Sequence, residues 1–405
     1  MIELEFSTIP DSDLDLVVLS RLVAEFSQEH HVHVRLSPMT WGNAWTELMT
    51  IASHGRGPHI SHIGGSWTSS LAMMNALRPF QPAELDVIGG ASAFMQPTWL
   101  STYLEGEADK VYAIPWTGYI YVICYRKDLL KQAGIDENTA FGTLEALSAT
   151  IKKLSRSDLE IPWLNPPIVA PYNDYLHTAA SWVWGSGGQF LDDSGKKLVF
   201  DSDACVRGVA SWLDTYRAVR PEHAGIGSVE GLALFASGKA AAVLADIRAA
   251  DSFFASDTLP LVRDNLGVAT LTEVPWCGGG NMVIWNHTRG VPEQEKAAVA
   301  LVQFLNSRKN QLAWAREVKS MPARMDALEE IYQTGHPLHD AVFLAARRGL
   351  PYMSVPLWRR VEYQLALALG AIMDEARANP QKESIQIVRE QLEPLARRLN
   401  LAFSG

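Results

Sequence analysis

Strand-like and helix-like patterns of hydrophobic residues alternate along the amino-terminal part of the chain. Residues 2–6, 32–36 and 59–63 have the apolar content of short β-strands, and in the first two the apolar residues alternate with polar ones. Apolar residues recur every four positions over 14–26, and a second helical pattern covers 45–52. Strands that alternate with helices at this spacing predict a parallel sheet with helical crossovers.

The rest of the chain continues this mixture of strands and helices. A small hairpin is predicted over 189–200 and a strand over 281–285, which follows a Gly-rich break. Residues 294–317 predict one long amphipathic helix. Beyond a break at 321–324 the remainder is almost all helical, with an interruption near 351–356. These patterns predict an α/β protein.

Length and composition limit the class of protein. With 405 residues the chain exceeds the size of a single core, so we expect about two domains. A net charge of −10 argues against a nucleic-acid backbone or an anionic membrane surface as the main partner. The 13 tryptophans are an unusually large number for this length. An indole ring offers a flat face that packs on the C–H surface of a sugar ring. We expect about half of them in the core, since Trp is usually largely buried.

The cysteines and the chain start carry little information about function. Cys124, Cys205 and Cys277 are widely spaced, so neither a disulfide framework nor a zinc signature follows. No apolar run approaches the length of a membrane-spanning helix. There is no signal peptide, because strand-like residues begin at Ile2. Met1 either replaces a removed export or lipoprotein signal or is a genuine cytoplasmic start, and the sequence leaves both open.

The segment Asp109-Lys-Val-Tyr-Ala-Ile-Pro-Trp116 and the residues after it predict a strand that bends at Pro115, a second strand and then a helix. This order resembles the crossover of the family 1 extracellular solute-binding proteins, which serve carbohydrate-importing ABC transporters. Other segments resemble the same family in collinear order. They are Pro58-His-Ile-Ser-His-Ile-Gly-Gly-Ser-Trp67, Leu77-Arg-Pro-Phe80, Trp184-Gly-Ser-Gly-Gly-Gln-Phe190, Phe235-Ala-Ser-Gly-Lys-Ala-Ala-Ala-Val243 and Ser320-Met-Pro-Ala-Arg324.

The resemblance implies a type II periplasmic-binding-protein fold of two α/β lobes. Three interlobe crossings would act as hinges, and a ligand would bind in the cleft and be buried by hinge closure. The implied first lobe holds residues 1–115 and 275–320, and the second holds 118–272 and 322–405, with hinges near 115–118, 272–276 and 320–323.

The function implied by the resemblance is non-catalytic binding of a sugar or oligosaccharide and its delivery to an ABC importer. The implied partners are a carbohydrate ligand and the permease subunits, with no nucleic acid and no cofactor, and the protein is expected to be a monomer. The implied location is extracytoplasmic, either periplasmic or as a membrane-anchored lipoprotein after signal removal. A sugar-sensing domain that reports to a receptor would use the same binding chemistry and stays an alternative.

A sugar requires aromatic platforms for its C–H faces and polar side chains for its hydroxyls. Trp41 and Trp45 follow the second predicted strand and lie four residues apart, so they can share a helix face. Ser66 and Trp67 follow the third strand, where ligands of open α/β sheets gather. These four residues are the first ligand candidates, and for Trp45 a hydrophobic staple on the core is an equal alternative.

The first predicted crossing and the following proline-rich segment add five candidates. Trp116, Thr117 and Tyr119 surround the crossing, where Trp116 either contacts ligand or packs between the lobes. Tyr172 matches a Pro-aromatic step of the maltodextrin-binding members, in which the Tyr stacks on ligand. Asn173 next to it is either a ligand contact or a helix cap.

Asp246 and Arg248 stand where many family members have Gly-Pro-Trp, with the Trp stacking on the sugar. Arg stacks on flat groups and also binds carboxylates with two hydrogen bonds. One interpretation is therefore an acidic sugar, and another is an Asp246–Arg248 pair that holds neutral hydroxyls. A surface ion pair of little consequence is the third.

The later crossings supply the remaining candidates. Trp276 lies at the second crossing beside Gly278 and Gly279, whose backbone N–H groups can approach a ligand closely. Arg324 follows the third crossing, where it contacts ligand or only ties the lobes together. Trp358 falls near a stacking Trp of maltodextrin-binding members, with a staple at a helix start as the alternative.

An enzyme is the weaker interpretation of the sequence. His31 and His33 fall on the polar side of a strand, and His59 and His62 lack a third ligand at a metal-binding spacing, so no metal site is expected. Neither a Gly-x-Ser-x-Gly nor a His-Glu-x-x-His motif is present. A glycosidase-like or lyase-like carbohydrate-active enzyme remains the alternative, because a carboxylate pair is not recognisable from sequence.

Overall fold

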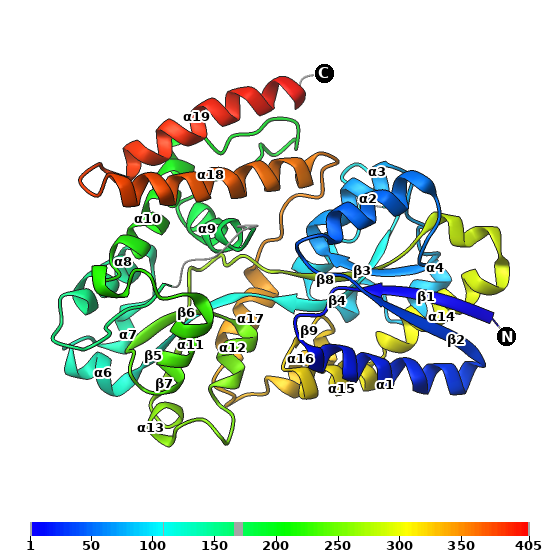
Figure 1. The fold of residues 1–405 in the computed structure, drawn as a ribbon, viewed down its shortest axis with the longest axis horizontal. Coiled ribbons are helices and arrows are strands. Elements are labelled where there is room, and N and C mark those ends of the chain that lie inside the picture. Colours follow the sequence, from blue (N-terminus) through cyan, green and yellow to red (C-terminus); the bar gives the residue numbers. More distant parts are fainter. Residues whose placement is uncertain (1, 108, 166–172, 404–405) are drawn as a thin grey trace. The chain divides into compact units, whose positions relative to one another are not determined.

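The computed structural model describes residues 2–107, 109–165 and 173–403, and Figure 1 shows their course. Contacts between residues divide the chain into two compact units, each with its own sheet. The first unit consists of Met1–Tyr119, Cys277–Gly335 and Pro351–Arg359, and the second of Ile120–Trp276, His336–Leu350 and Arg360–Gly405.

The first unit contains strands and helices from three separate parts of the chain. In chain order they are β1 (Ile2–Thr8), α1 (Asp13–His30), β2 (Val32–Pro38), α2 (Ala44–His54), β3 (Ile60–Gly64), the 3-10 helix η1 (Gly65–Trp67), α3 (Thr68–Met73), α4 (Pro82–Val87), η2 (Ala91–Ala93), α5 (Gln96–Leu100), β4 (Ala113–Tyr119), β8 (Gly278–Ile284), η4 (Asn286–Gly290), α14 (Pro292–Leu305), α15 (Arg308–Val318), β9 (Met321–Pro322) and α16 (Met325–Ile331).

A six-stranded sheet with the order β2-β1-β3-β8-β4-β9 forms the centre of the first unit. Strands β1, β2 and β3 run parallel, as the alternating sequence pattern predicts. Strand β8 enters the sheet antiparallel, between β3 and β4. The carboxyl ends of β1, β2 and β3 therefore meet at one edge of the sheet, and this edge is where ligand sites of open α/β sheets form.

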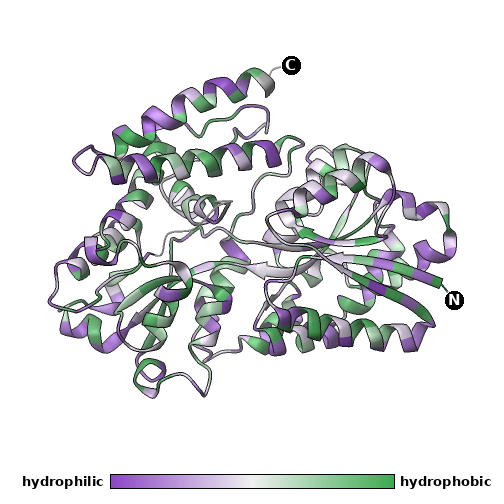
Figure 2. Cartoon of the chain, viewed as in Figure 1, coloured by the Kyte–Doolittle hydropathy of each residue, from purple (hydrophilic) through white to green (hydrophobic). Residues whose placement is uncertain are grey.

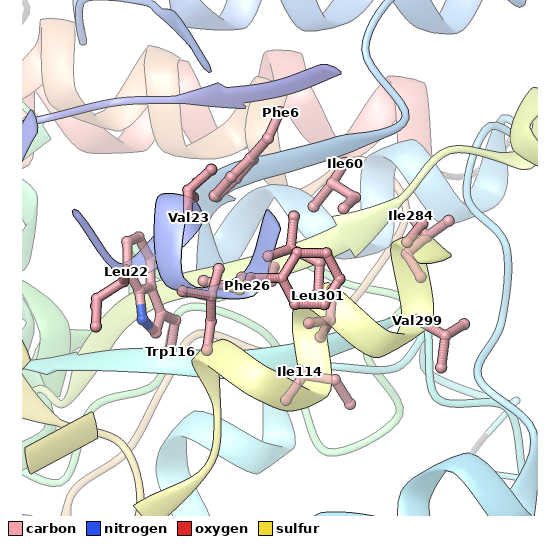
Figure 3. Packing of buried hydrophobic residues seen from close by; sticks show 14 of the residues in the cluster. Phe6, Leu22, Val23, Phe26, Ile60, Ile114, Trp116, Ile284, Val299 and Leu301 are labelled. Carbon is pink, nitrogen blue, oxygen red and sulfur yellow. The ribbon is translucent and has the colours of Figure 1, made fainter. Parts of the chain in front are cut away.

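Buried hydrophobic side chains cover both faces of this sheet. On one face Phe6 and Ile60 pack with Phe26 of α1 and with residues of α14 (Figure 3). On the other face Ile63 packs with Leu48 of α2. Burial of such a side chain contributes about 1.5–3 kcal/mol relative to leaving it exposed. The two cores hold the strand ends in place, and they explain why β3 is buried along its whole length.

Helix α1 begins with a side-chain cap directly after the loop that follows β1. Ser12 provides the cap, and its hydroxyl accepts the backbone N–H of Asp15 at 3.4 Å. The predicted four-residue spacing then places Val18, Leu22 and Phe26 in the core. The loop between β1 and α1 is thereby fixed at both ends, by the sheet and by the cap.

The long helix predicted over residues 294–317 is two helices in the structure, so this prediction is wrong. Helix α14 ends before α15 starts, and the Ser307 hydroxyl caps α15 by accepting the Asn310 N–H at 3.3 Å. Because both helices pack on the same core cluster, the hydrophobic spacing continues across the break and does not reveal it.

The boundaries of the units differ from those expected for the lobes in the last part of the chain. Residues 322–335 and 351–359 were expected in the second lobe and lie in the first unit. Strand β9 pairs antiparallel with β4 and so keeps the chain that follows it in the first unit. For 351–359, the Ser69 hydroxyl donates a hydrogen bond to the Val355 carbonyl at 3.0 Å.

The second unit is richer in helices than the first. Its elements are β5 (Tyr121–Arg126), α6 (Lys127–Gln132), α7 (Glu137–Ala140), α8 (Leu144–Ser155), α9 (Asn173–Gly185), α10 (Asp203–Arg217), η3 (Pro221–His223), α11 (Ser228–Ala236), β6 (Ala242–Asp246), α12 (Ile247–Ser252), α13 (Pro260–Arg263), β7 (Leu266–Thr270), α17 (His339–Arg348), α18 (Trp358–Ala378), whose first two residues belong to the first unit, and α19 (Ser384–Phe403).

Strand β5 is the centre of the three-stranded antiparallel sheet β6-β5-β7 in this unit. Helices α9 and α10 lie between β5 and β6 in the chain and pack on each other through Tyr175, Trp212 and Tyr216. We call these three residues the aromatic core of the second unit. The Trp212 ring lies 5.6 Å from that of Tyr175 and 5.0 Å from that of Tyr216. Helices α18 and α19 carry hydrophobic and hydrophilic residues in turn along their length, as helices with one buried side do (Figure 2).

None of the described helices has both the length and the apolar character needed to cross a bilayer. Cys124, Cys205 and Cys277 are buried free thiols.

Candidate functional site

Three loops with polar and aromatic residues follow the parallel strands of the first unit. Asp11 lies after β1, Trp41 lies after β2, and Ser66 and Trp67 lie in η1 directly after β3. These loops share the edge of the sheet at which β1, β2 and β3 end. The structure therefore brings together Trp41, Ser66 and Trp67, which the sequence singles out separately.

Three tryptophans pack edge to face at this edge, and we call Trp41, Trp45 and Trp67 the tryptophan cluster. The Trp67 ring lies 5.7 Å from that of Trp41 and 5.6 Å from that of Trp45, with interplanar angles of 74° and 67°. Trp67 is 3% exposed, whereas Trp41 is 41% exposed. Trp67 thus supports the cluster from inside, and Trp41 offers an accessible indole surface.

One hydrogen bond and ring contacts hold the exposed Trp41 in place. Its indole N–H donates to Oδ1 of Asp11 at 2.8 Å. Its ring also meets the ring of His62 nearly at right angles, with centroids 6.3 Å apart. A carboxylate acceptor makes the indole hydrogen bond stronger than a neutral one. The ring is therefore presented in a defined orientation.

His62 lies below the tryptophan cluster and is buried. Its ring contacts that of Trp116 edge-on at 4.9 Å, and a Cβ on Gly280 would lie 2.1 Å from its Nε2 atom. Burial is the largest influence on this imidazole and lowers its pKa to about 4, so the ring is neutral near pH 7. His62 is thus an uncharged spacer between the strand β8 backbone and the cluster.

Arg359 completes the cluster from a distant part of the sequence. Its guanidinium carbon lies 5.3 Å from the Trp45 ring centroid and 5.5 Å from that of Trp67, within cation–π range. The segment that carries it is bound to α3, because the Ser70 hydroxyl donates to the Pro356 carbonyl at 2.8 Å. The helix turn that follows Trp67 therefore anchors the segment that brings Arg359 to the cluster.

The other candidates of the first crossing have structural contacts within the first unit. Trp116 is 1% exposed and packs on Trp314, with centroids 4.6 Å apart. It occupies a register shift of β4 against β8, which makes it an extra residue in the strand. The Thr117 hydroxyl accepts the Gly280 N–H at 3.0 Å. Tyr119 ends β4, half-buried and opposite Gly278.

The glycines at the start of β8 permit close approach of two backbones. Gly279 has φ +152°, and a Cβ there would lie 1.9 Å from the Thr117 carbonyl oxygen. Any side chain at this position would force β4 and β8 apart. Strand packing thus accounts for Gly279, and Gly278 pairs with the last residue of β4.

Arg324 and Trp358 are also engaged within the first unit. The Arg324 guanidinium donates to both carboxylate oxygens of Asp326, at 3.0 and 2.8 Å, and to the Ile88 carbonyl at 2.8 Å. Trp358 is 1% exposed and stacks on Tyr352 with centroids 4.7 Å apart. These contacts give both residues a role in packing.

The second unit holds the remaining candidates. Asp246 caps α12, where its Oδ1 accepts the backbone N–H groups of Arg248 at 2.9 Å and Ala249 at 3.0 Å. Burial raises the pKa of Asp246 above its usual value, and these backbone hydrogen bonds act against that shift. Arg248 is half-buried. Trp276 is buried and stacks on His177 with centroids 4.2 Å apart.

Two candidates fall on the limits of the described structure. Tyr172 lies outside the described residues. Asn173 is the first residue of α9, and its side chain is outside the described part.

Among the described residues, His, Cys, Asp and Glu do not gather in a group of three or more that would hold a metal ion.

Comparison with known proteins decides the family. The sequence profile of a family described as "Bacterial extracellular solute-binding protein" matches residues 21–336. The chain belongs to this family. A binding-protein family confirms the resemblance inferred from the sequence and favours solute binding over catalysis.

Individual relatives agree with this assignment. The diacetylchitobiose binding protein DasA of Streptomyces coelicolor is 23% identical over 355 residues, which cover 84% of this chain and 77% of DasA. The structure described as "Maltose bound T. maritima MalE3" has a TM-score of 0.78 at 22% identity and covers 98% of this chain and 100% of that chain. A chitin oligosaccharide binding protein has a TM-score of 0.79 at 17% identity, with 100% and 99% covered. These similarities confirm the predicted periplasmic-binding-protein fold.

Three residues that contact the tryptophan cluster were not singled out from the sequence as ligand candidates. Asp11 follows a parallel strand at the sheet edge where ligands of open α/β sheets bind, and this position is a signal that the sequence contains. His62 was considered only as a metal ligand. Arg359 directly follows the candidate Trp358, but nothing local links it to Trp45.

Proposed function

We propose that the protein binds a sugar or oligosaccharide without changing it chemically and delivers it to an ABC importer. Support comes from the family, whose members bind solutes, and from the relatives, whose names include diacetylchitobiose, maltose and chitin oligosaccharide. The observation that carries the proposal for this chain is the partly exposed Trp41 at the carboxyl ends of the parallel strands.

The chemistry of the first unit's edge suits a saccharide. The C–H face of a pyranose ring stacks on the accessible surface of Trp41, and Ser66 offers a hydroxyl for hydrogen bonds at its margin. Trp45 and Trp67 would then act as support for the stacking ring. Arg248 of the second unit remains a proposed contact that would favour an acidic group on the sugar.

The finer biological setting is part of the same proposal. The protein acts outside the cytoplasm, in the periplasm or as a lipoprotein, and works as a monomer that docks on permease subunits. A separate ATPase would supply the energy of transport. An affinity near micromolar corresponds to about 8 kcal/mol of binding free energy, which a stacked ring and several hydrogen bonds to charged groups can provide.

A panel of neutral and acidic oligosaccharides tests the proposal by calorimetry and thermal shift. At least one saccharide should raise the melting temperature in a saturable way, because a ligand that binds only the folded state stabilises it. The bound sugar should be recovered unchanged by chromatography. If no saccharide of the panel raises the melting temperature while another class of solute does, carbohydrate binding is excluded. Recovery of hydrolysed sugar would favour an enzyme.

The variant Trp41→Ala tests the place of binding. Its affinity for the stabilising saccharide should fall by about tenfold, since stacking on an aromatic side chain is worth up to ~1.5 kcal/mol and about 1.4 kcal/mol corresponds to a tenfold change. Tyr363→Ala is the matched control, because Tyr363 is an exposed aromatic residue on α18 and should leave the affinity unchanged. Equal affinities of wild type and Trp41→Ala would remove this edge as the binding site.

A further inference from the structure

Trp41 combines partial exposure with firm attachment. It leaves 41% of its surface accessible and at the same time donates its indole N–H to Asp11 and touches the rings of Trp67 and His62. An exposed side chain normally moves among several rotamers. These contacts restrict Trp41 on three sides and leave one part of the ring accessible.

Asp11 is itself fixed by the first turn of α1. Its backbone N–H donates to Oδ2 of Asp15 at 3.0 Å, and the Ser12 hydroxyl donates to the other oxygen of the same carboxylate at 2.7 Å. Asp15 is 5% exposed, so the anchor is buried. The Asp11 backbone thus has a defined position relative to the helix, and its short side chain places the carboxylate within hydrogen-bond distance of the Trp41 indole.

The Asp11–Trp41 hydrogen bond connects two loops that the sheet places side by side. Asp11 follows β1 and Trp41 follows β2, and these strands pair in parallel from Ile2 opposite Val32 to Thr8 opposite Pro38. A ring contact alone permits an indole to slide or turn, whereas a directed N–H···O bond selects one orientation of the ring plane. The bond therefore supplies the restraint that stacking contacts lack.

We infer that Asp11 is a positioning residue for solute binding, which holds the Trp41 ring in the orientation needed for stacking before the solute arrives. This inference rests on the proposed function. A ring that is already ordered loses less conformational freedom on binding, so the affinity rises without any new contact to the solute. Asp11 lies outside the part of the chain that matches the family profile, whereas Trp41 lies inside it.

A double-mutant cycle separates positioning from direct contact. Asp11→Ala should weaken binding of the stabilising saccharide about tenfold, whereas the same change in a Trp41→Phe background should have an effect of about twofold or less, because Phe lacks the N–H. Asp11→Asn keeps an oxygen acceptor for the indole and should stay within about threefold of wild type. Equal losses from Asp11→Ala in both backgrounds would mean that Asp11 contacts the solute itself and would overturn the inference.

A measurement without solute keeps the inference independent of the proposed function. In a ¹⁵N-labelled sample the Trp41 indole N–H signal is identified by its absence in Trp41→Phe. Asp11→Ala should move this signal and broaden it, and Asp11→Asn should change it less. An unaltered signal in Asp11→Ala would refute the positioning role. If the signal responds as expected while no saccharide binds, the proposed function fails and the positioning of Trp41 stands.

Discussion

The tryptophan cluster of the first unit and the aromatic core of the second unit share the same ring geometry but differ in burial. Both consist of rings packed edge to face at about the same distance, 5.6 Å for Trp45–Trp67 and 5.6 Å for Tyr175–Trp212. Trp212 is 0% exposed, however, whereas Trp41 is 41% exposed. Ring packing alone therefore does not distinguish a core from a candidate binding surface.

The partners of the indole N–H groups show the same difference. Trp212 donates to the Thr178 hydroxyl at 3.0 Å, a neutral acceptor inside the helix pair α9 and α10. Trp41 donates to the Asp11 carboxylate, a charged group that stays solvated at the surface. A buried carboxylate would incur a large desolvation cost, so the aromatic core uses a neutral acceptor. The charge of the acceptor of the indole hydrogen bond thus reflects whether the ring cluster lies at the surface or in the core.

The largest effect that tests this comparison is on stability. Trp212→Ala should lower the free energy of unfolding by about 3–5 kcal/mol, because it leaves a cavity among buried rings and removes the indole hydrogen bond to Thr178. Trp41→Ala should lower it by about 1 kcal/mol or less, as for most exposed side chains. Urea denaturation followed by circular dichroism measures both. Similar losses in the two variants would show that the tryptophan cluster is an ordinary core.

The second prediction concerns pH and involves only the first unit's cluster. The pKa of His62 is about 4 in the folded protein and about 6.5 when unfolded, so the unfolded chain takes up its proton first as the pH falls. Stability should therefore decrease between pH 6.5 and 4, by up to about 3 kcal/mol for this group.

The variant His62→Gln isolates that contribution, since Gln does not titrate in this range. Its unfolding free energy should depend less steeply on pH between 6.5 and 4 than that of the wild type, whatever its stability at neutral pH. Trp212→Ala, by contrast, should keep the wild-type slope. Parallel slopes for His62→Gln and wild type would mean that the imidazole is not buried beneath the cluster.

The third prediction tests whether a distant segment supports the cluster. Arg359→Ala should destabilise the first unit by about 1 kcal/mol through loss of its cation–π contacts with Trp45 and Trp67. The neighbouring Arg360 is exposed, and Arg360→Ala serves as the matched control with an effect near zero. Fluorescence of the tryptophans should shift in Arg359→Ala and not in the control, and identical spectra would contradict the contact.

Local patterns predicted the scaffold of the first unit and some residues of its candidate site. Strands β1 to β3 and helices α1 and α2 follow from alternation and from four-residue spacing, because each depends on burial of one face by nearby residues. Ser66 and Trp67 follow from the rule that ligands gather at the ends of parallel strands, and Trp41 from its place after the second strand and its spacing from Trp45. The structure brings these three residues to one edge of the sheet.

The features of the fold and of the candidate site that were not predicted depend on contacts between residues far apart in the chain. Arg359 reaches Trp45 only because 351–359 returns to the first unit, and no periodic pattern encodes such a return. The break before α15 is hidden because both helices bury the same face. The packing of Gly279 against Thr117 likewise appears only when β4 and β8 are paired, so a sequence rule assigns this glycine to ligand binding as readily as to strand packing.

The smallest expected effect is that of Asp246→Asn in the second unit. This variant tests whether solute binding is confined to the tryptophan cluster. Asp246→Ala should lower stability by about 1 kcal/mol because it removes the cap of α12, and Asp246→Asn should change it by less than about 0.5 kcal/mol because Asn caps equally well. If Asp246 acts only as a cap, the solute affinity of Asp246→Asn equals that of the wild type, and this is the result we expect from calorimetry. A loss of affinity with stability intact would mean that this carboxylate binds the solute. The binding surface would then not be confined to the tryptophan cluster.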